Sequence, residues 1–301
     1  IIGSKEALSL TKLPKKIIII GSGAIGCEFA FYFNSFGADV ELIEMQKRIL
    51  PMEDTDISDA LKEDFLASGI KVHNNSSVKS IEKLKNSIKV NIETEKKQLS
   101  MSGKLALLAV GVEGNIDNIG LNRVGVRTEN GSISIDSKCQ TNIPNIFAIG
   151  DVTGPPWLAH KSSAQGHMVA DFINGGSIHE IDHFNIPNCT YCQPQVGSLG
   201  LTESRALELG HNIKVGKFYF RACGKAMAVG NTFGFVKLIF DAKYGELIGA
   251  HIIGEGATEM IAELNIAKAL ESTWEDLAMT MHAHPTLSEA VMEAAMDAYG
   301  V

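Results

Sequence analysis

Three glycines early in the chain have the spacing of a dinucleotide-binding loop. Gly21, Gly23 and Gly26 directly follow a run of four isoleucines, residues 17–20, and complete a GxGxxG pattern. In this pattern Gly21 permits the tight turn, Gly23 lets the backbone approach a pyrophosphate, and Gly26 lets the next helix pack closely on the strand. The free N–H groups at the start of that helix bind the phosphates.

A second expected strand, residues 40–43, ends at Glu44, where such a fold places an acid against a ribose 2′-OH. An isolated GxGxxG is weak evidence, but strand, glycines, helix, second strand and acid occur here in order and predict a Rossmann-type site. A carboxylate accepts from a free 2′-OH and repels a 2′-phosphate, so we expect NAD rather than NADP. The alternative for Glu44 is a solvated strand end. Glu28 either faces the nicotinamide or is a first-turn acid that suits the helix dipole.

Two other spacings are candidates for redox or metal chemistry. Cys189 and Cys192 form a CxxC pair on an expected strand, whereas active CxxC pairs usually start a helix, so a disulfide or metal role is not favoured. His282 and His284 lie in the segment HAHPTLSE. The residues alone leave open a helix-capping loop, a metal pair or a general base. We predict no metal site.

Composition excludes several classes of protein. The 301 residues carry a formal charge of −8, which argues against a nucleic-acid partner. No apolar run approaches the ~20 residues that span a bilayer. The five cysteines are scattered and odd in number, and the start of the chain does not read as a signal peptide. These features predict a cytoplasmic protein with reduced thiols.

Four segments together resemble the flavoprotein disulfide reductases, and among them the dihydrolipoamide dehydrogenase family. They are residues 17–30, 145–152, 198–203 and 281–295. The resemblance implies an α/β fold in which a Rossmann-type NAD-binding domain with a β-meander covers residues 14–132. Residues 133–183 would be the returning part of an FAD-binding Rossmann domain, and residues 184–301 an α+β dimerisation domain.

The family's FAD-binding GxGxxG and its CxxxxC redox pair have no counterpart in this sequence. The chain is therefore expected to correspond to the C-terminal two thirds of such an enzyme, with residues 1–13 as a linker from the FAD-binding half. We expect residues 70–103 to form the antiparallel meander and residues 141–151 to form an apolar strand. The chain alone is not expected to complete a catalytic cycle.

The resemblance also implies roles for single residues. Those expected to contact NAD are Gly21, Gly23, Gly26, Glu28, Glu44 and Gly111. For Gly111 the alternative is an ordinary strand-end turn. Asp151 matches the aspartate that binds the FAD ribityl chain and pyrophosphate region, and Leu158 and Ala159 match the stretch beside the flavin ring. Val112 and Gly114 replace an arginine and a proline of the family pattern, which removes any polar contact that the arginine supplied.

The most specific site that the resemblance implies is the pair of His284 and Glu289. His284 would be the base that activates a dithiol, Glu289 would orient and polarise it, and His282 would be structural. The pair would serve the active site of the other subunit of an obligate homodimer. The expected activity is oxidation of protein-bound dihydrolipoamide through a redox disulfide and FAD to NAD⁺, on the lipoylated acyltransferase core of 2-oxo acid dehydrogenase complexes. Alternatives are a mercuric or glutathione-type reductase, or a non-catalytic dimerising module that binds NAD.

Overall fold

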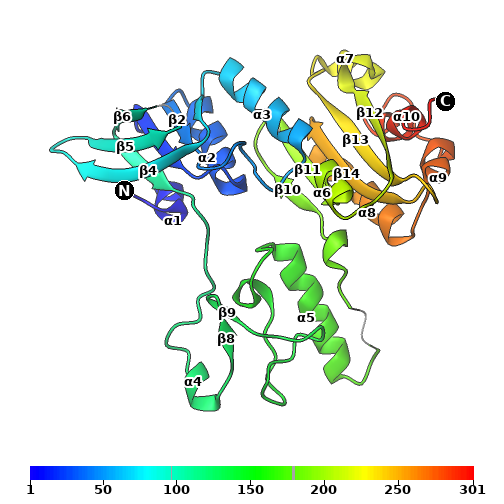
Figure 1. Ribbon diagram of the computed structural model, residues 1–301, viewed down its shortest axis with the longest axis horizontal. Helices are drawn as coiled ribbons and strands as arrows, with labels where there is room; N and C mark the ends of the chain where they lie inside the picture. Colours follow the sequence, from blue (N-terminus) through cyan, green and yellow to red (C-terminus); the bar gives the residue numbers. More distant parts are fainter. Residues whose placement is uncertain (96, 178–179) are drawn as a thin grey trace. The chain divides into compact units, whose positions relative to one another are not determined.

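The computed structural model describes residues 1–95, 97–177 and 180–301 (Figure 1). It consists of two compact units. The first contains residues 1–110 and 187–301, and the second contains residues 111–186. No helix within the described ranges is both long and apolar enough to cross a membrane.

A four-stranded parallel sheet organises the N-terminal part of the first unit. Its order is β3-β2-β1-β7, with β1 Lys16–Ile20, β2 Asp39–Ile43, β3 Lys71–His73 and β7 Leu105–Leu108. Helix α2 (Ala24–Ser35) connects β1 to β2, and helix α3 (Thr55–Ala67) connects β2 to β3. This confirms the expected Rossmann-type fold.

The isoleucine run of β1 is buried because the sheet is covered on both faces. Ile17 and Ile19 pack in a core with residues of α2 and α3. Ile18 and Ile20 point the other way and pack against apolar residues of a separate antiparallel sheet. Successive side chains alternate between the faces of a strand, so burial of both faces requires an unbroken apolar run.

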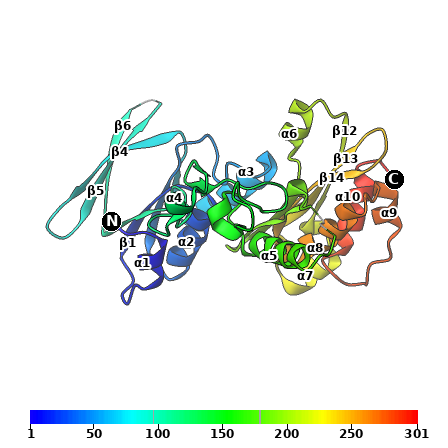
Figure 2. The same cartoon turned by 90° about the horizontal axis from the view of Figure 1, so that it is seen from below.

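That second sheet is the meander, and it is shorter than expected. Its strands are β4 Ser76–Lys83, β5 Ile88–Thr94 and β6 Gln98–Gly103 (Figure 2). The expectation that residues 70–74 begin the meander is wrong, because β3 pairs in parallel with β2. The connection through α3 has the length that a parallel crossover needs, and a three-residue strand carries too little pattern to choose between the sheets.

Residues 1–13, expected to be a linker from the FAD-binding half, contain secondary structure. Helix α1 (Ser4–Leu8) lies in this segment, and Ile2 forms a parallel bridge with Leu107 of β7. Ala7 is buried in the same core as Ile17. A helix of five residues is too short to show an apolar period, so it was not predicted from the sequence.

The C-terminal part of the first unit is an antiparallel sheet packed on helices. The sheet order is β10-β11-β14-β13-β12, with β10 Asn188–Thr190, β11 Gln195–Gly200, β12 Ile213–Tyr219, β13 Gly234–Asp241 and β14 Leu247–Gly254. The helices are α6 Glu203–Glu208, α7 Gly224–Val229, α8 Ala257–Ala269, α9 Trp274–Met279 and α10 Glu289–Asp297. Helices α8 and α10 cover one face of the sheet and share its core (Figures 1 and 2). Thr202 caps α6 by accepting from the amide of Arg205.

The second unit is smaller. Its elements are α4 Leu121–Val124, the hairpin β8 Thr128–Glu129 and β9 Ser132–Ile133, the 3₁₀ turns Gly150–Thr153 and His183–Asn185, and α5 Ala159–Ile173. The strand expected over residues 141–151 does not form within the described residues, where Phe147 only bridges Gln140. A strand needs a neighbour for its backbone groups, and the described part of this unit supplies none beyond that bridge.

Close packing of β12 on α10 gives a test of the fold. A Cβ atom on Gly216 would lie 1.9 Å from the carbonyl oxygen of Ala294. We expect Gly216→Ala to lower the free energy of unfolding by about 1–3 kcal/mol, because α10 must move away. Urea denaturation measures this loss. The control is Lys214→Ala at an exposed position of the same strand, with an expected change within about 0.5 kcal/mol. Equal losses in both variants would contradict the steric explanation.

Candidate functional site

The three glycines of the GxGxxG loop differ in how closely other atoms approach them. Gly21 has a φ of +96°, and a Cβ atom there would lie 2.4 Å from the carbonyl oxygen of Ala109. A Cβ atom on Gly26 would lie 2.0 Å from the carbonyl oxygen of Gly21. Gly23 differs, because a Cβ atom there would meet nothing within 4 Å. The first and third glycines are therefore required by packing, whereas Gly23 borders open space.

Helix α2 begins beside this open space. Gly23 is its N-cap, and no side chain caps the helix. The first amides of an uncapped helix lack partners and carry partial positive charge, so they attract an anion. The loop thus offers room and backbone donors together. This arrangement fits the pyrophosphate of a dinucleotide.

Glu44 follows β2, as expected, but its carboxylate is held by the protein itself. Oε2 accepts from the amide of Ser22 at 2.9 Å and from its hydroxyl at 2.6 Å, while Oε1 accepts from the amide of Gln46 at 2.7 Å. An ionised carboxylate has about four acceptor sites, so three donors leave one on Oε1 for a ribose hydroxyl. The acid therefore fits an adenosine ribose and is fixed in place beforehand.

Ser22 is a site residue that the sequence analysis missed. Its side chain is fully buried, and its carbonyl oxygen accepts from the amide of Leu50 at 2.8 Å. Ser22 therefore joins Glu44 to the loop that leads into α3. The only signal in the sequence is a small polar residue between Gly21 and Gly23, which the GxGxxG pattern treats as arbitrary.

Glu28 lies on α2 and contacts the C-terminal part of the first unit. Its Oε1 accepts from the backbone amide of Tyr191 at 2.9 Å. Burial raises the pKa of Glu28, and the bond from Tyr191 opposes that rise. The predicted role of Glu28 beside a nicotinamide stays a prediction. Its contact with a residue 163 positions away had no signal in the sequence.

The remaining cofactor candidates belong to the second unit. Gly111 has a φ of +128°, which favours glycine, and its predicted contact with NAD stays a prediction. Asp151 is exposed on the 3₁₀ turn, and Leu158 and Ala159 form the start of α5. No side chain caps α5. An exposed carboxylate and open helix amides are groups that fit the hydroxyls and phosphates of FAD.

Lys161 on α5 is buried near these residues. Its Nζ donates to the carbonyl oxygen of Gly154 at 2.7 Å, which ties α5 to the loop before it. Burial lowers the pKa of Lys161, and the charge of Asp151 opposes this change. Lys161 also lines a hollow of about 400 Å³ with Thr153 and Gln165. No pattern in the sequence predicts a buried lysine at this position.

His284 and Glu289 are in contact. His284 Nδ1 lies 2.8 Å from Glu289 Oε1, and Glu289 Oε2 accepts from the amide of Thr286 at 2.8 Å. The side chain of His284 is 76 % exposed. Held this way, His284 donates through Nδ1 and presents Nε2 as an acceptor, which is the tautomer that a general base needs. Their catalytic roles stay predictions.

Two neighbours hold the loop that carries this pair. Both ring nitrogens of His282 face oxygens, Nδ1 the carbonyl of Thr280 at 2.9 Å and Nε2 the carboxylate of Glu263 at 2.6 Å. The buried thiol of Cys223 donates to the carbonyl oxygen of Thr286 at 3.4 Å. The expectation that His282 is structural agrees with these contacts, whereas Cys223 was not foreseen.

Cys189 and Cys192 do not sit at a helix start. Cys189 lies on β10, and Cys192 follows it in a bend. Burial raises the pKa of Cys192 to about 12, which keeps this sulfur a thiol. All five cysteines of the sequence fall in the described ranges, and each is a free thiol there.

Comparison with known proteins gives two family matches. Residues 1–166 match the model of the pyridine nucleotide-disulphide oxidoreductases, and residues 186–295 match the dimerisation domain of the same name. A dihydrolipoyl dehydrogenase from Rhizobium etli is 45% identical over 297 residues, which are 98% of this chain and 62% of that protein. The enzyme of the same name from Bacillus subtilis is 40% identical over 302 residues, 100% of this chain and 64% of that protein.

Solved structures agree with these matches. LpdA from Mycobacterium tuberculosis superposes with a TM-score of 0.90 at 26% identity, over 98% of this chain and 64% of that one. The HOCl-induced flavoprotein disulfide reductase RclA from Escherichia coli superposes with a TM-score of 0.89 at 27% identity. The match covers 98% of this chain and 67% of that one. The chain thus spans a little under two thirds of the length of the curated relatives it matches.

The His284–Glu289 contact predicts a measurable titration. Glu289 should titrate below the ordinary glutamate pKa of about 4.3, because the amide of Thr286 and then His284 bond to its charged form. Since the folded-state pKa is lowered, the stabilisation is present above the ordinary pKa and is lost as the pH falls through the folded value.

Carbon-13 NMR of the Glu289 carboxyl group measures this pKa. His284→Ala should raise it but leave it below the ordinary value, because the Thr286 amide remains. His211→Ala is the control and should leave it unchanged, because His211 is exposed and lies outside this loop. An unchanged pKa in His284→Ala would contradict the pairing.

Proposed function

Because this chain belongs to the pyridine nucleotide-disulphide oxidoreductase family, we propose that the protein containing it is a dihydrolipoyl dehydrogenase. The observation that carries the proposal is the His284–Glu289 pair, set in a chain that is 45% identical to such an enzyme over 297 residues. The reaction removes two electrons and two protons from dihydrolipoamide. NAD⁺ takes up both electrons and one proton, and the other proton is released.

His284 is the base in this proposal. A dithiol attacks a disulfide only as its thiolate, so a proton must first leave the sulfur. That proton moves to Nε2 of His284, while Glu289 accepts the hydrogen bond from Nδ1 and stabilises the imidazolium that forms. The large exposed fraction of His284 supports a role in an active site completed by a second subunit.

NAD and FAD are the cofactors in this proposal. The loop from Gly21 to Gly26 and the Glu44 carboxylate would hold NAD, while Asp151 and the start of α5 would hold part of FAD. The two cofactors supply the electron transfer from disulfide to nicotinamide. Glu44 favours NAD over NADP, because a second negative charge beside it would be repelled.

Two partners follow from this proposal. A second copy would bind through the dimerisation domain, residues 186–295. The lipoylated acyltransferase core of a 2-oxo acid dehydrogenase complex would supply the substrate. Support for this second partner is the enzyme name shared by the curated relatives.

Nucleotide choice tests the assignment of Glu44. Glu44→Gln should raise the Kd of NADH by about 10-fold or more, since hydrogen bonds to charged groups contribute about 1.5–3 kcal/mol. It should also reduce the difference between the Kd of NADH and the Kd of NADPH. Fluorescence titration measures both constants. Glu41→Gln is the matched control, because Glu41 lies on the strand that leads to Glu44 but bonds to Lys16 and His73. Equal effects of the two variants would remove Glu44 from the nucleotide site.

Loss of the base tests the activity. In the purified holoenzyme, His284→Gln should lower kcat for dihydrolipoamide oxidation by about 10²–10⁴-fold, the usual contribution of a general base. The Kd of NADH should not change. His211→Gln is the control. His211 is exposed and well separated in the sequence from His284, so this variant should keep full activity. A His284→Gln enzyme with kcat near the wild-type value would rule out the proposed role.

A further inference from the structure

One face of the five-stranded sheet carries a row of polar side chains, one from each strand. Strand pairing places Asn188 opposite Ser198, Ser198 opposite His251, His251 opposite Lys237, and Lys237 opposite Lys217. We call these five residues the polar row. It crosses the whole sheet from β10 to β12. Such a row is unusual in a sheet whose other face packs on helices, and it needs polar partners.

On the three central strands, β11, β14 and β13, the residues two positions along from the polar row are apolar and lie on the same face. Val196, Ile253 and Phe235 are opposite one another and belong to the core that includes α2 and α3. The polar row is thus the edge of a contact between the sheet and the nucleotide-binding fold. A purely apolar contact would have used hydrophobic side chains here as well.

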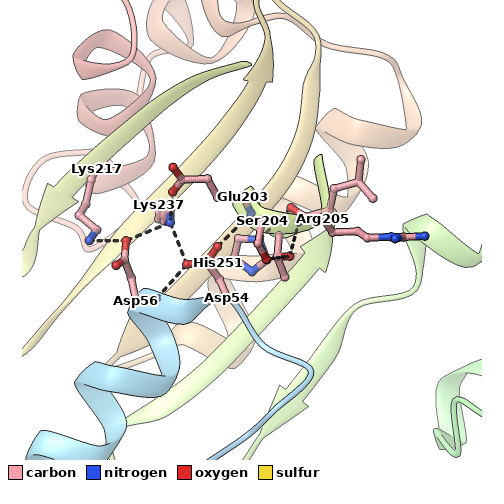
Figure 3. Close-up of polar contacts among 10 residues, drawn as sticks. Asp54, Asp56, Glu203, Ser204, Arg205, Lys217, Lys237 and His251 are labelled. Carbon is pink, nitrogen blue, oxygen red and sulfur yellow. Dashed lines mark hydrogen bonds and ion pairs between the residues drawn. The ribbon is translucent and has the colours of Figure 1, made fainter. Parts of the chain in front are cut away.

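Acidic residues at the start of α3 face the polar row. Glu53, Asp54 and Asp56 form what we call the acidic turn. Asn188 donates to Glu53 at 2.5 Å, and Lys217 pairs with Asp56 at 2.7 Å. Figure 3 shows the central part of this contact, where both lysines point to the carboxylates of α3. The two groups are complementary in charge.

Lys237 is the centre of the contact. Its Nζ lies 2.8 Å from Asp54, 2.9 Å from Asp56 and 2.6 Å from Glu203, and its side chain is only 2 % exposed. Burial would lower the pKa of Lys237, but hydrogen bonds to Asp54 and Glu203 outweigh it and raise the pKa. Burial likewise would raise the pKa of Asp54, but His251 and Lys237 hold it low. Neither charge is stable there without the other.

Asp54 also bonds to α3 and to α6, the short helix that follows β11. Its Oδ1 accepts from the amide of Asp56 and caps α3, while Oδ2 accepts from the amide of Glu203 at 3.0 Å. One buried carboxylate therefore bonds to Lys237, to α3 and to α6. Movement of the acidic turn would break all of these bonds together.

A short series of backbone bonds connects the acidic turn to the nucleotide loop. The amide of Glu53 donates to the carbonyl of Leu50 at 2.9 Å, and the amide of Leu50 donates to the carbonyl of Ser22 at 2.8 Å. Ser22 in turn donates twice to Glu44. Lys237 is thus linked to the ribose-binding acid through protein contacts alone.

We propose that Lys237 is a positioning residue for the nucleotide loop. It anchors the acidic turn to the sheet, and the turn holds Ser22 and Glu44 where the nucleotide binds. The nucleotide part of this inference rests on the proposed function, which assigns NAD to this loop. The anchoring of the turn does not depend on that assignment.

Lys237→Met in the purified protein tests the proposal. We expect faster amide hydrogen exchange over residues 45–54 and a rise of about 5-fold or more in the Kd of NADH, measured where circular dichroism shows the variant folded. Asp54→Asn combined with Lys237→Met removes both buried charges and should recover stability. The Kd should remain raised in this double variant, because the ionic anchor is still missing.

Leu238→Ala is the matched control. Leu238 is the next residue of β13, fully buried in the core on the opposite face with α8 and α10. It should destabilise the same sheet without faster exchange over residues 45–54 and without a change in the Kd of NADH. A Kd that rises equally in Leu238→Ala, or that returns to normal in the double variant, would refute the positioning role.

The two proposals fail in different ways. A wild-type protein that does not bind NADH would refute the proposed function. Unchanged exchange over residues 45–54 in Lys237→Met would refute the positioning role whether or not NADH binds.

Discussion

A buried ammonium group must be surrounded by acceptors, and this requirement at Lys237 shapes the first unit. The three carboxylates around it come from the start of α3 and from α6, and the lysine itself comes from the middle of β13. No one of these elements can place the charge alone. The nucleotide-binding fold and the antiparallel sheet therefore lie in one compact unit.

Steric constraints fix the backbone of the nucleotide loop, and hydrogen bonds fix its polar side chains. Gly21 and Gly26 fix the backbone of the nucleotide loop because no side chain fits beside it. Ser22 and Glu44 then fix the polar groups of the same loop by hydrogen bonds. The loop meets a ligand with its shape already set, and preorganisation of this kind lowers the ordering cost of binding.

Local patterns predicted much of the fold and part of the site. The isoleucine run, the three glycines and Glu44 follow one another within 28 residues, so their spacing reports their arrangement directly. The pairing of His284 with Glu289 was implied by the family resemblance, and its contact lies within one loop and the helix that follows it. The roles of these residues in catalysis and binding remain predictions.

Long-range contacts were not predictable from the same patterns. Lys237 and Asp54 are 183 positions apart, and no local spacing pattern connects them. The short strand β3 and the five-residue helix α1 carry too few residues to show a period. Residues 141–151 have the composition of a strand, but the described part of their unit provides only a single bridge.

The polar row also has a consequence for how the sheet folds. Side chains alternate between the two faces of a strand, so a slip of one residue would turn Lys237 or His251 into the apolar core beneath α8 and α10. A slip of two residues would place them in the apolar row of Val196, Ile253 and Phe235. Each misaligned pairing would bury a charged or polar group without a partner. The row that joins the sheet to α3 therefore also specifies the alignment of the five strands with one another.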